Sequence, residues 1–422
     1  MDVLHSAPLD DGRRPPHPWV YTVLIVPFGA TSGFVTVALA FLGTKFGLTV
    51  EQTATLVAAN MFPQVWKFFW APVGDKTLTR KRWYLISVVF CAAGMWAMAT
   101  VPLGPKTLTL MGVIIALTSV AATFQGFAVE GLVAHITPPD DRGRVSGWFQ
   151  AGNLGGSGIG GGLGLWLLNS LPAPWIAGTV LAVLTLLCAF PLLWVRDIPA
   201  DKSAGSVARS VQDVAIDLWQ VLKSNAGILC GLLCFLPLGT GAAASVLTQA
   251  EVAAHWGAGD HEVELVQGLL TGAISMVGCL VGGPMCGRWL SARAAYALFG
   301  GLMALVTAAM AISPATVTMY VGYSLAYAFV TGLCYAAFSA LVLETIGSGH
   351  AATKYNGFAS LSNAPIWYMG LVLAWAQTKW GSSGMLFAES VFGVVGIVVF
   401  VAVATYLRPA PAGSEAVATE AA

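Results

Sequence analysis

Long apolar runs follow one another along most of this chain, and their length restricts the fold more than any other feature. Each run has about 20 to 28 residues, enough for a helix to cross roughly 30 Å of hydrocarbon. Of the 422 residues, 57% are hydrophobic and only 9% are charged, whereas about a quarter of the residues of a soluble protein are charged. Because lipid offers no partner to the backbone, and because the runs lack two-residue alternation, they are expected to be helices. The sequence therefore predicts an all-α membrane protein that is embedded in the lipid bilayer. No nucleic-acid partner is expected.

Short polar segments divide the apolar sequence into twelve predicted membrane spans. Helix ends predicted from sequence are accurate only to a few residues. The spans lie near residues 19–43, 51–74, 83–103, 108–136, 145–169, 175–195, 226–248, 265–287, 294–313, 316–344, 355–378 and 383–407.

Lysine and arginine are distributed unevenly between the loops, which predicts the orientation of the chain. Loops on the cytoplasmic side of a membrane carry an excess of these residues. With a cytoplasmic N-terminus, sixteen of the 20 basic residues fall on the inside, and only Lys45, Lys106 and Lys379 fall on the outside. We therefore expect a multi-pass protein of the cell inner (plasma) membrane with both termini in the cytoplasm.

Composition also predicts the domain boundaries. Residues 1–18 are polar and proline-rich, unlike a cleavable signal peptide, and form a cytoplasmic tail. The polar segment 196–224 separates an N-terminal six-helix bundle, 19–195, from a C-terminal one, 226–407. Its second part has the apolar spacing of an amphipathic helix on the inner membrane surface. Residues 408–422 are predicted to be a disordered cytoplasmic tail.

The two halves of the chain repeat each other. The run RVSGWFQAGN at 144–153 aligns with KYNGFASLSN at 354–363, an offset of 210 residues. APVGDK at 71–76 aligns with GPMCGR at 283–288, an offset of 212. Two six-helix repeats joined by an inside linker resemble the major facilitator superfamily, whose halves rock around a central site. The resemblance implies twelve transmembrane helices in two six-helix repeats.

The glycine-rich stretch NLGGSGIGGGLG, residues 153–164, contains a formal GxGxxG pattern. A dinucleotide fingerprint needs a preceding strand, a helix that begins at the glycines and a later acidic residue, and the sequence around this stretch provides none of these. Glycines four residues apart instead leave a smooth strip that lets a second helix approach closely. We therefore predict helix packing, and sliding of one helix against another, from Gly156, Gly158, Gly160, Gly162 and Gly164.

Lys67 and Glu130 are charged residues inside predicted spans. Lys67 lies roughly 12 Å from the inner end of its span, where a lysine costs about 2.5 to 3.5 kcal/mol on insertion scales. Glu130 lies at a similar depth in a span of the same half that runs in the same direction. We predict that the two form a charge pair in which Glu130 is the proton-coupling acid, because its neighbours can shift the proton affinity of a buried carboxyl. The alternatives are a purely structural pair, or two charges that face water in the cavity.

Other polar residues inside the spans are weaker candidates for the substrate cavity. Each has an alternative role in packing or hydrogen bonding between helices. We expect the lone acids Glu344 and Glu389, near span ends, to be solvated at the membrane interface. The cavity candidates are Gln64, Gln125, Asn153 and Asn363, and Tyr323 or Tyr327 from the aromatic face that they share with Tyr320.

The sequence WKFFWAPVGDK around Lys67 resembles the peptide/acetyl-CoA transporter branch of the superfamily, which includes the AmpG-like muropeptide permeases. Asp75 and the basic run Arg80, Lys81 and Arg82 resemble the superfamily's loop signature, which implies that they latch a cytoplasmic gate. Ala71 stands where that signature has its first glycine, and Gln125 is followed by Gly126 rather than by an acid. The resemblance implies a large solute with a polar head, such as a muropeptide, a siderophore or an acyl-CoA.

Together these features predict a secondary active transporter that imports a bulky amphipathic small molecule with protons by alternating access, and that acts as a monomer without a cofactor. The alternatives are a facilitative or antiport exporter of small organic solutes, and a membrane signalling protein that transports nothing. The sequence contains no nucleophile elbow, nucleotide loop or His-Glu metal spacing, and its seven cysteines lie in apolar segments. These observations argue against an enzyme.

Overall fold

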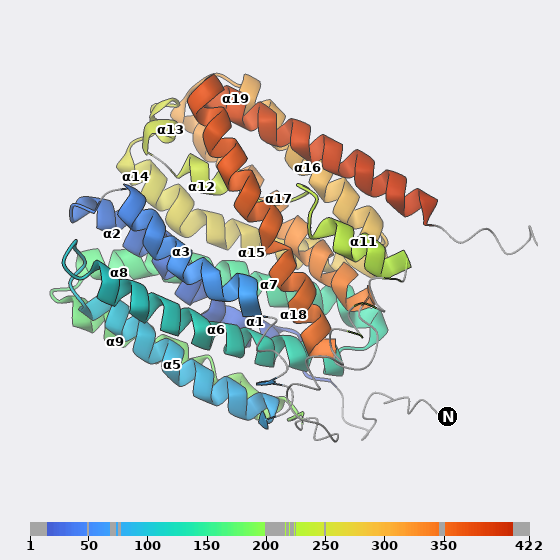
Figure 1. Cartoon of the computed structure of the whole chain (residues 1–422), viewed down its shortest axis with the longest axis horizontal. Helices are drawn as coiled ribbons and strands as arrows, with labels where there is room; N and C mark the ends of the chain where they lie inside the picture. The colour runs from blue at the N-terminus through green and yellow to red at the C-terminus, as the bar shows by residue number, and fades with distance from the viewer. Residues whose placement is uncertain are drawn as a thin grey trace, which may run out of the picture.

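The computed structural model describes residues 15–48, 50–67, 73–74, 77–198, 216, 219, 223, 225–248, 250–345 and 351–407. Long helices run side by side along the molecule, and the two halves of the chain occupy opposite sides of it (Figure 1). The first half contains α1 (Trp19–Gly33), η1 (Phe34–Leu39), α2 (Ala40–Lys45), α3 (Val50–Trp66), α5 (Arg80–Thr100), α6 (Leu108–Ile136), η3 (Pro139–Asp141), α7 (Arg142–Gly158), η4 (Ile159–Leu163), α8 (Gly164–Ser170), α9 (Pro174–Leu187) and η5 (Phe190–Trp194). The second contains α11 (Asn225–Leu233), α12 (Ala243–Leu247), α13 (Ala250–Ala254), α14 (Asp260–Val263), η6 (Glu264–Leu270), α15 (Thr271–Arg288), α16 (Ala292–Ile312), α17 (Val317–Thr345), α18 (Ala351–Leu361) and α19 (Asn363–Tyr406).

These helices account for twelve crossings. Within the described residues, 8 segments are long and apolar enough to span a membrane alone. One of these, the 50-residue segment Gly357–Tyr406, holds two crossings, because the chain turns back at Gly381, whose φ is 69°, into the second arm of α19 (Figure 1). Three more crossings come from α3, from α7 continued by η4 and α8, and from α11 with α12. The predicted all-α fold of twelve helices in two repeats is confirmed.

The seventh crossing is interrupted, and the prediction of an unbroken span over 226–248 is wrong. Helix α11 ends at Leu233 and α12 begins only at Ala243. Pro237 lies in the connection and has no backbone N–H for a helix. Gly239 and Gly241 have φ values of 65° and 70°, which belong to the left-handed region that glycine tolerates and that ends a helix. The hydrophobicity of the segment identifies the crossing but not its break.

Hydrophobic packing between the two halves closes one end of the bundle. We call the end that holds Arg80, Arg142 and Arg288 the basic end. There a single hydrophobic cluster joins both halves, with Leu24, Leu132, Phe149, Val342 and Phe358 among its buried members. Each half also has a hydrophobic cluster of its own, and that of the second half extends to Cys286 and Ala292 near the basic end. The structure is therefore closed at the basic end.

The glycine-rich helix α7 packs closely against helices on two sides. On one side, a side chain at Gly156 would lie 2.5 Å from the Val26 carbonyl oxygen of α1. On the other, a side chain at Gly158 would lie 2.9 Å from Gly272 Cα of α15, in the opposite half. Neither position has room for a Cβ. The glycines therefore bring α7 into backbone contact with both neighbours, as helix packing by GxxxG pairs requires.

Several expectations fall on residues outside the described ranges. These are the amphipathic helix predicted within 196–224, of which only isolated positions are described, most of the tail 1–18, the tail 408–422 and the gate residue Asp75. The predicted domain boundaries remain predictions.

Candidate functional site

Lys67 and Glu130 form an ion pair between the second and fourth crossings. Lys67 follows the last residue of α3, and Glu130 lies about two turns before the end of α6. The distance from Lys67 Nζ to Glu130 Oε1 is 3.0 Å, and each residue is only 5% exposed. Glu130 Oε2 is also buried and has no hydrogen-bond partner within the described structure. The carboxylate therefore retains an unused acceptor site beside its single cation.

Phe28 of α1 forms one wall of this site. Lys67 Nζ lies 5.9 Å from the centre of the Phe28 ring, a distance at which a cation and an aromatic face attract each other. A Cβ at Gly126, one turn before Glu130, would lie 3.2 Å from Phe28 Cδ2. A longer side chain at position 126 would meet this ring. Gly126, which replaces the acid expected from the resemblance, thus leaves room for an apolar wall beside the pair.

The second half of the chain covers the pair from the opposite side. Helix α18 packs against both α6 and α3 at the basic end (Figure 1). Tyr355 of α18 lies close enough to Glu130 for an electrostatic interaction. Its hydroxyl donates to Ser339 Oγ of α17 at 2.9 Å. The ion pair therefore lies below a contact between the halves that must open if the basic end opens.

A chain of side-chain hydrogen bonds crosses the same contact. Gln150 of α7 donates through Nε2 to Ser339 Oγ at 2.5 Å. Asn153, one turn along α7, donates to Gln150 Oε1 at 3.0 Å. Asn153 thus reaches the second half of the protein through Gln150, whereas the sequence predicted that it lines the cavity. The sequence analysis missed Gln150, Ser339 and Tyr355. The spacing of residues within one helix does not show which of its faces meets a helix of the other half.

The two glutamines near the pair lie in different surroundings. Gln125 is fully buried, and its amide donates to the Leu24 carbonyl oxygen of α1. Tyr84 of α5 donates to the same oxygen at 3.0 Å. Gln125 therefore links three helices of the first half in this conformation. Gln64 is half-buried on α3, one turn before Lys67. Contact of either glutamine with a solute remains a prediction.

The tyrosines of α17 divide between a buried polar cluster and the edge of the core. Tyr320 and Tyr327 are buried, and Tyr323 is partly buried against the core of the second half. The Tyr327 hydroxyl donates to Glu389 Oε1 of α19 at 2.6 Å. Glu389 is 5% exposed, so the expectation that it is solvated at the interface is wrong. The position of Glu389 near the end of its predicted span suggested contact with solvent, but the side chain faces α17.

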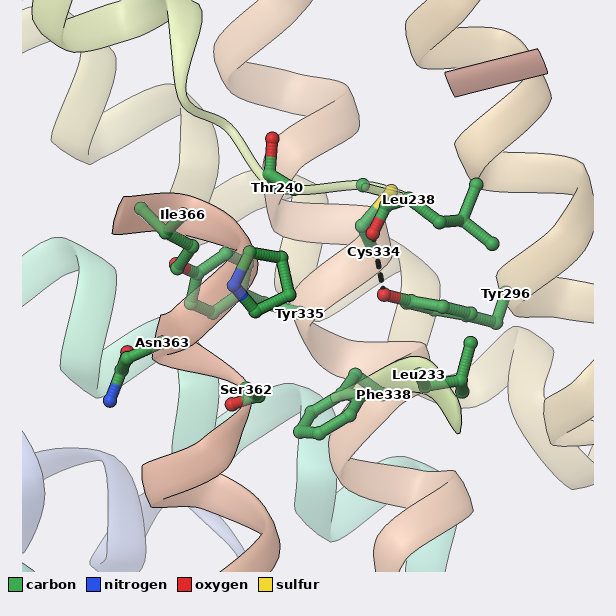
Figure 2. Close-up of a pocket in the computed structure, with 12 residues that line it drawn as sticks. Leu233, Leu238, Thr240, Tyr296, Cys334, Tyr335, Phe338, Ser362, Asn363 and Ile366 are labelled. Atoms are coloured by element: carbon green, nitrogen blue, oxygen red, sulfur yellow. Dashed lines mark hydrogen bonds between the residues drawn. The ribbon is translucent and has the colours of Figure 1, made fainter. Parts of the chain in front are cut away.

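Asn363 lines a small cavity within the second half (Figure 2). The cavity encloses about 50 Å³, room for a few water molecules. Its wall includes the broken segment of the seventh crossing, with Thr240, and Tyr335 of α17. Tyr335 was not among the candidates, although it lies eight residues after Tyr327 and so continues the same helix face. The cavity is lined from α17, α19 and the α11–α12 connection, and the Asn363 amide in its wall donates to the Ala359 carbonyl oxygen at 3.2 Å.

The described residues of the predicted gate are anchored to the first half. Arg80 begins α5 and is buried, with its guanidinium carbon 4.3 Å from the centre of the Phe127 ring of α6. A side chain at Gly74 would collide with the same ring. The Lys81 backbone N–H donates to Asp197 Oδ1 at 3.1 Å, and that of Arg82 donates to the Thr79 hydroxyl that caps α5. Phe127 thus connects the segment that holds Gly74 to the helix that carries Glu130.

Phe127→Leu is expected to lower the free energy of unfolding by about 1 to 2 kcal/mol. The substitution keeps an apolar side chain but removes the aromatic face, and a desolvated cation over such a face is worth up to about 2 kcal/mol. Equilibrium unfolding in lipid bicelles measures the change. Phe62→Leu is the control, because Phe62 is 66% exposed and this exchange should change the stability little. Equal stabilities of the two variants would contradict the role of Phe127.

Twelve crossings in two halves, with charged and polar side chains buried between helices, are the architecture expected of a membrane transport protein. The sequence matches the family description "Major Facilitator Superfamily" over residues 21–370. The chain belongs to this superfamily of secondary transporters, as the sequence predicted.

Solved structures share the fold. The human organic anion transporter MFSD10 (TETRAN) superimposes with a TM-score of 0.68 at 17% identity, covering 92% of this chain and 100% of its own. The proton:xylose symporter XylE, solved with 6-bromo-6-deoxy-D-glucose, gives a TM-score of 0.64 at 12% identity, covering 92% and 96%. Among curated proteins, no sequence matches the chain. At these identities the similarity concerns the fold alone.

Proposed function

We propose that the protein imports a bulky amphipathic solute together with protons, with Glu130 as the proton acceptor and Lys67 as its counter-charge. The observation that carries the proposal is the 3.0 Å ion pair between two buried side chains, placed where α18 of the second half covers α6 of the first. A buried charged pair adds little to stability compared with apolar packing. Its presence at this position therefore favours a role in transport.

The charges of the pair explain how solute and proton would be coupled. A proton that binds Glu130 neutralises the carboxylate and leaves Lys67 as an unpaired buried cation. An unpaired buried charge costs several kcal/mol, so this state is poor unless another anion replaces the carboxylate. An acidic group on the solute supplies that anion. Proton and anionic solute therefore favour each other's binding, and both are carried in one cycle.

This chemistry requires an acidic group on a solute of the classes that the sequence suggested. Muropeptides, siderophores and acyl-CoA molecules can each present an acidic group together with a large remainder. Two of the structural neighbours are named as transporters of organic anions and of xylose with protons, which is in keeping with an anionic solute and with proton coupling. The proposed solute is thus an amphipathic organic anion whose acidic group approaches Lys67.

The proposal includes an orientation and a location. With the basic end in the cytoplasm of a cell whose inner membrane holds the protein, both termini are cytoplasmic, and the conformation described here is closed toward the cytoplasm. Solute would enter from the outside, and import would follow when the contacts of Tyr355, Ser339 and Gln150 break. We propose that one chain suffices, since both halves of the site come from it.

Glu130→Gln is expected to abolish proton-driven accumulation while leaving exchange of solute across the membrane. The amide keeps the shape of the side chain but binds no proton. Uptake by the unchanged protein in proteoliposomes should fall as the external pH rises, because fewer protons are available to load. Uptake by the variant should be independent of pH and should stop at equal concentrations. Glu344→Gln is the control, since Glu344 is an exposed carboxyl at the basic end.

The solute is best identified by a thermal-shift screen of the purified protein against muropeptides, siderophores, acyl-CoA and sugars. A hit must then show pH-dependent uptake that Glu130→Gln removes. Uptake that keeps its pH dependence in this variant would refute Glu130 as the acceptor. If no solute stabilises the protein and neutral variants of Lys67 and Glu130 behave like the unchanged chain, a signalling role is favoured instead.

A further inference from the structure

Glu389 is a buried carboxyl that the proposed coupling pair does not involve. It lies in the second arm of α19 and is the only charged residue of the sequence between Ser382 and Tyr406. The structure gives it no basic partner among the residues that it describes. Its Oε1 accepts the Tyr327 hydroxyl at 2.6 Å, while Oε2 is buried without a hydrogen bond in the described part of the chain. One acceptor of this acid is thus satisfied and the other is not.

Tyr327 connects this carboxyl to the break in the seventh crossing. While its O–H donates to Glu389, its oxygen accepts the backbone N–H of Ala243 at 3.2 Å. Ala243 is the first residue of α12, directly after the connection with the two left-handed glycines. The same connection packs on α19, since a side chain at Gly396 would lie 3.4 Å from Leu238 Cβ. A change at Glu389 therefore reaches the segment of the seventh crossing that lacks continuous helical hydrogen bonds.

Few other titratable groups face this carboxyl. From α17 it meets Tyr327, and Cys334 lies two turns farther along the same helix. Helix α12 carries no titratable side chain. Helix α16 meets this part of α19 through the Ala304 carbonyl oxygen, which accepts from Ser390 at 2.8 Å. Tyr296 of α16 contacts Phe400 instead, about three helical turns from Glu389 along α19. The carboxylate is therefore faced by the Tyr327 hydroxyl and by the Ala243 backbone N–H, and by no ion among the residues that the structure describes.

We propose that Glu389 is a second proton-binding site, and that its protonation releases α12 from Tyr327. The ionised carboxylate accepts a charge-assisted hydrogen bond from Tyr327, roughly twice as strong as a neutral one, and so holds the tyrosine oxygen against the Ala243 N–H. A hydronium ion that gives its proton to Oε2 leaves water and a neutral acid, whose bond to Tyr327 is weaker. Tyr327 and α12 are then free to move. This site does not depend on Lys67 or Glu130.

Infrared difference spectroscopy of the purified full chain in lipid tests the site directly. We expect a protonated-carboxyl band that appears as the pH falls, persists in Glu130→Gln and is absent in Glu389→Gln. Tyr327→Phe should keep the band but change its frequency, because the carboxyl loses its hydrogen bond. Glu344→Gln should leave the band unchanged.

The outcomes separate this site from the coupling pair. Loss of the band in Glu130→Gln alone would assign the proton to the first half and overturn the proposal for Glu389. A titration that moves with sodium concentration would overturn it in favour of a cation site.

At one pH at which Glu389 is ionised, hydrogen exchange of the peptide that holds Ala243 should be faster in Tyr327→Phe than in the unchanged protein. Equal exchange would overturn the link to α12. Failure of Glu130→Gln to alter uptake leaves these results unaffected.

Discussion

Lys67→Met is expected to lower the free energy of unfolding by about 3 to 5 kcal/mol, the range found when one partner of a buried ion pair is removed. Methionine fills a similar volume, so the loss comes from the charge left behind rather than from a cavity. Glu130 would remain 5% exposed without the cation that lies 3.0 Å away in the unchanged protein. Equilibrium unfolding in lipid bicelles measures the loss, and transport should cease with it.

The double variant Lys67→Met, Glu130→Gln separates charge from packing. With both charges gone, the site holds no unpaired ion, and most of the lost stability should return. Transport should remain absent because neither the proton acceptor nor the cation is present. Lys106→Met is the control, since Lys106 is an exposed lysine and its replacement should change stability by less than about 0.5 kcal/mol. A double variant as unstable as Lys67→Met would show that the pair is not held together by charge.

Hydrophobicity predicts the crossings of this fold because lipid leaves the backbone no alternative to a helix. It does not predict where a crossing breaks. The connection around Gly239 is nearly as apolar as a helix, and Pro237 and the left-handed backbone of two glycines separate α11 from α12. The turn between the last two crossings is equally small, since a single residue, Gly381, turns the chain back within α19.

Depth along a helix predicted the neighbours of Lys67 but not those of Glu389. Lys67 and Glu130 lie on two helices of one half at the same depth, so few other partners were within reach. The same argument placed Glu389 near a membrane surface. Depth does not determine which way a side chain points around the helix, and Glu389 points to Tyr327. The repeat did not predict the surroundings of Asn153 and Asn363 either, although the two align in sequence. Asn153 donates to Gln150, whereas Asn363 lines a cavity.

Gly147→Ala is expected to shift the protein toward the conformation that is open at the basic end. A Cβ at Gly147 of α7 would lie 2.5 Å from the Cys279 carbonyl oxygen and 2.8 Å from Gly283 Cα, both on α15 of the opposite half. These are backbone atoms, so the two halves must separate locally to make room. Overpacking of this kind costs about 1 to 3 kcal/mol. Since the penalty falls on the closed state, the ratio of open to closed protein should rise by about 5- to 150-fold.

Gly156→Ala is the matched control on the same helix. Its Cβ would lie 2.5 Å from the Val26 carbonyl oxygen of α1, which moves together with α7 as part of the first half. The clash is therefore present in both conformations and should lower stability without changing their ratio. Spin labels at His135 of α6 and Glu344 of α17, both exposed at the basic end, report the ratio as a distribution of distances. A longer distance is expected for Gly147→Ala alone. Equal distributions in the two variants would mean that α7 and α15 do not separate when the basic end opens.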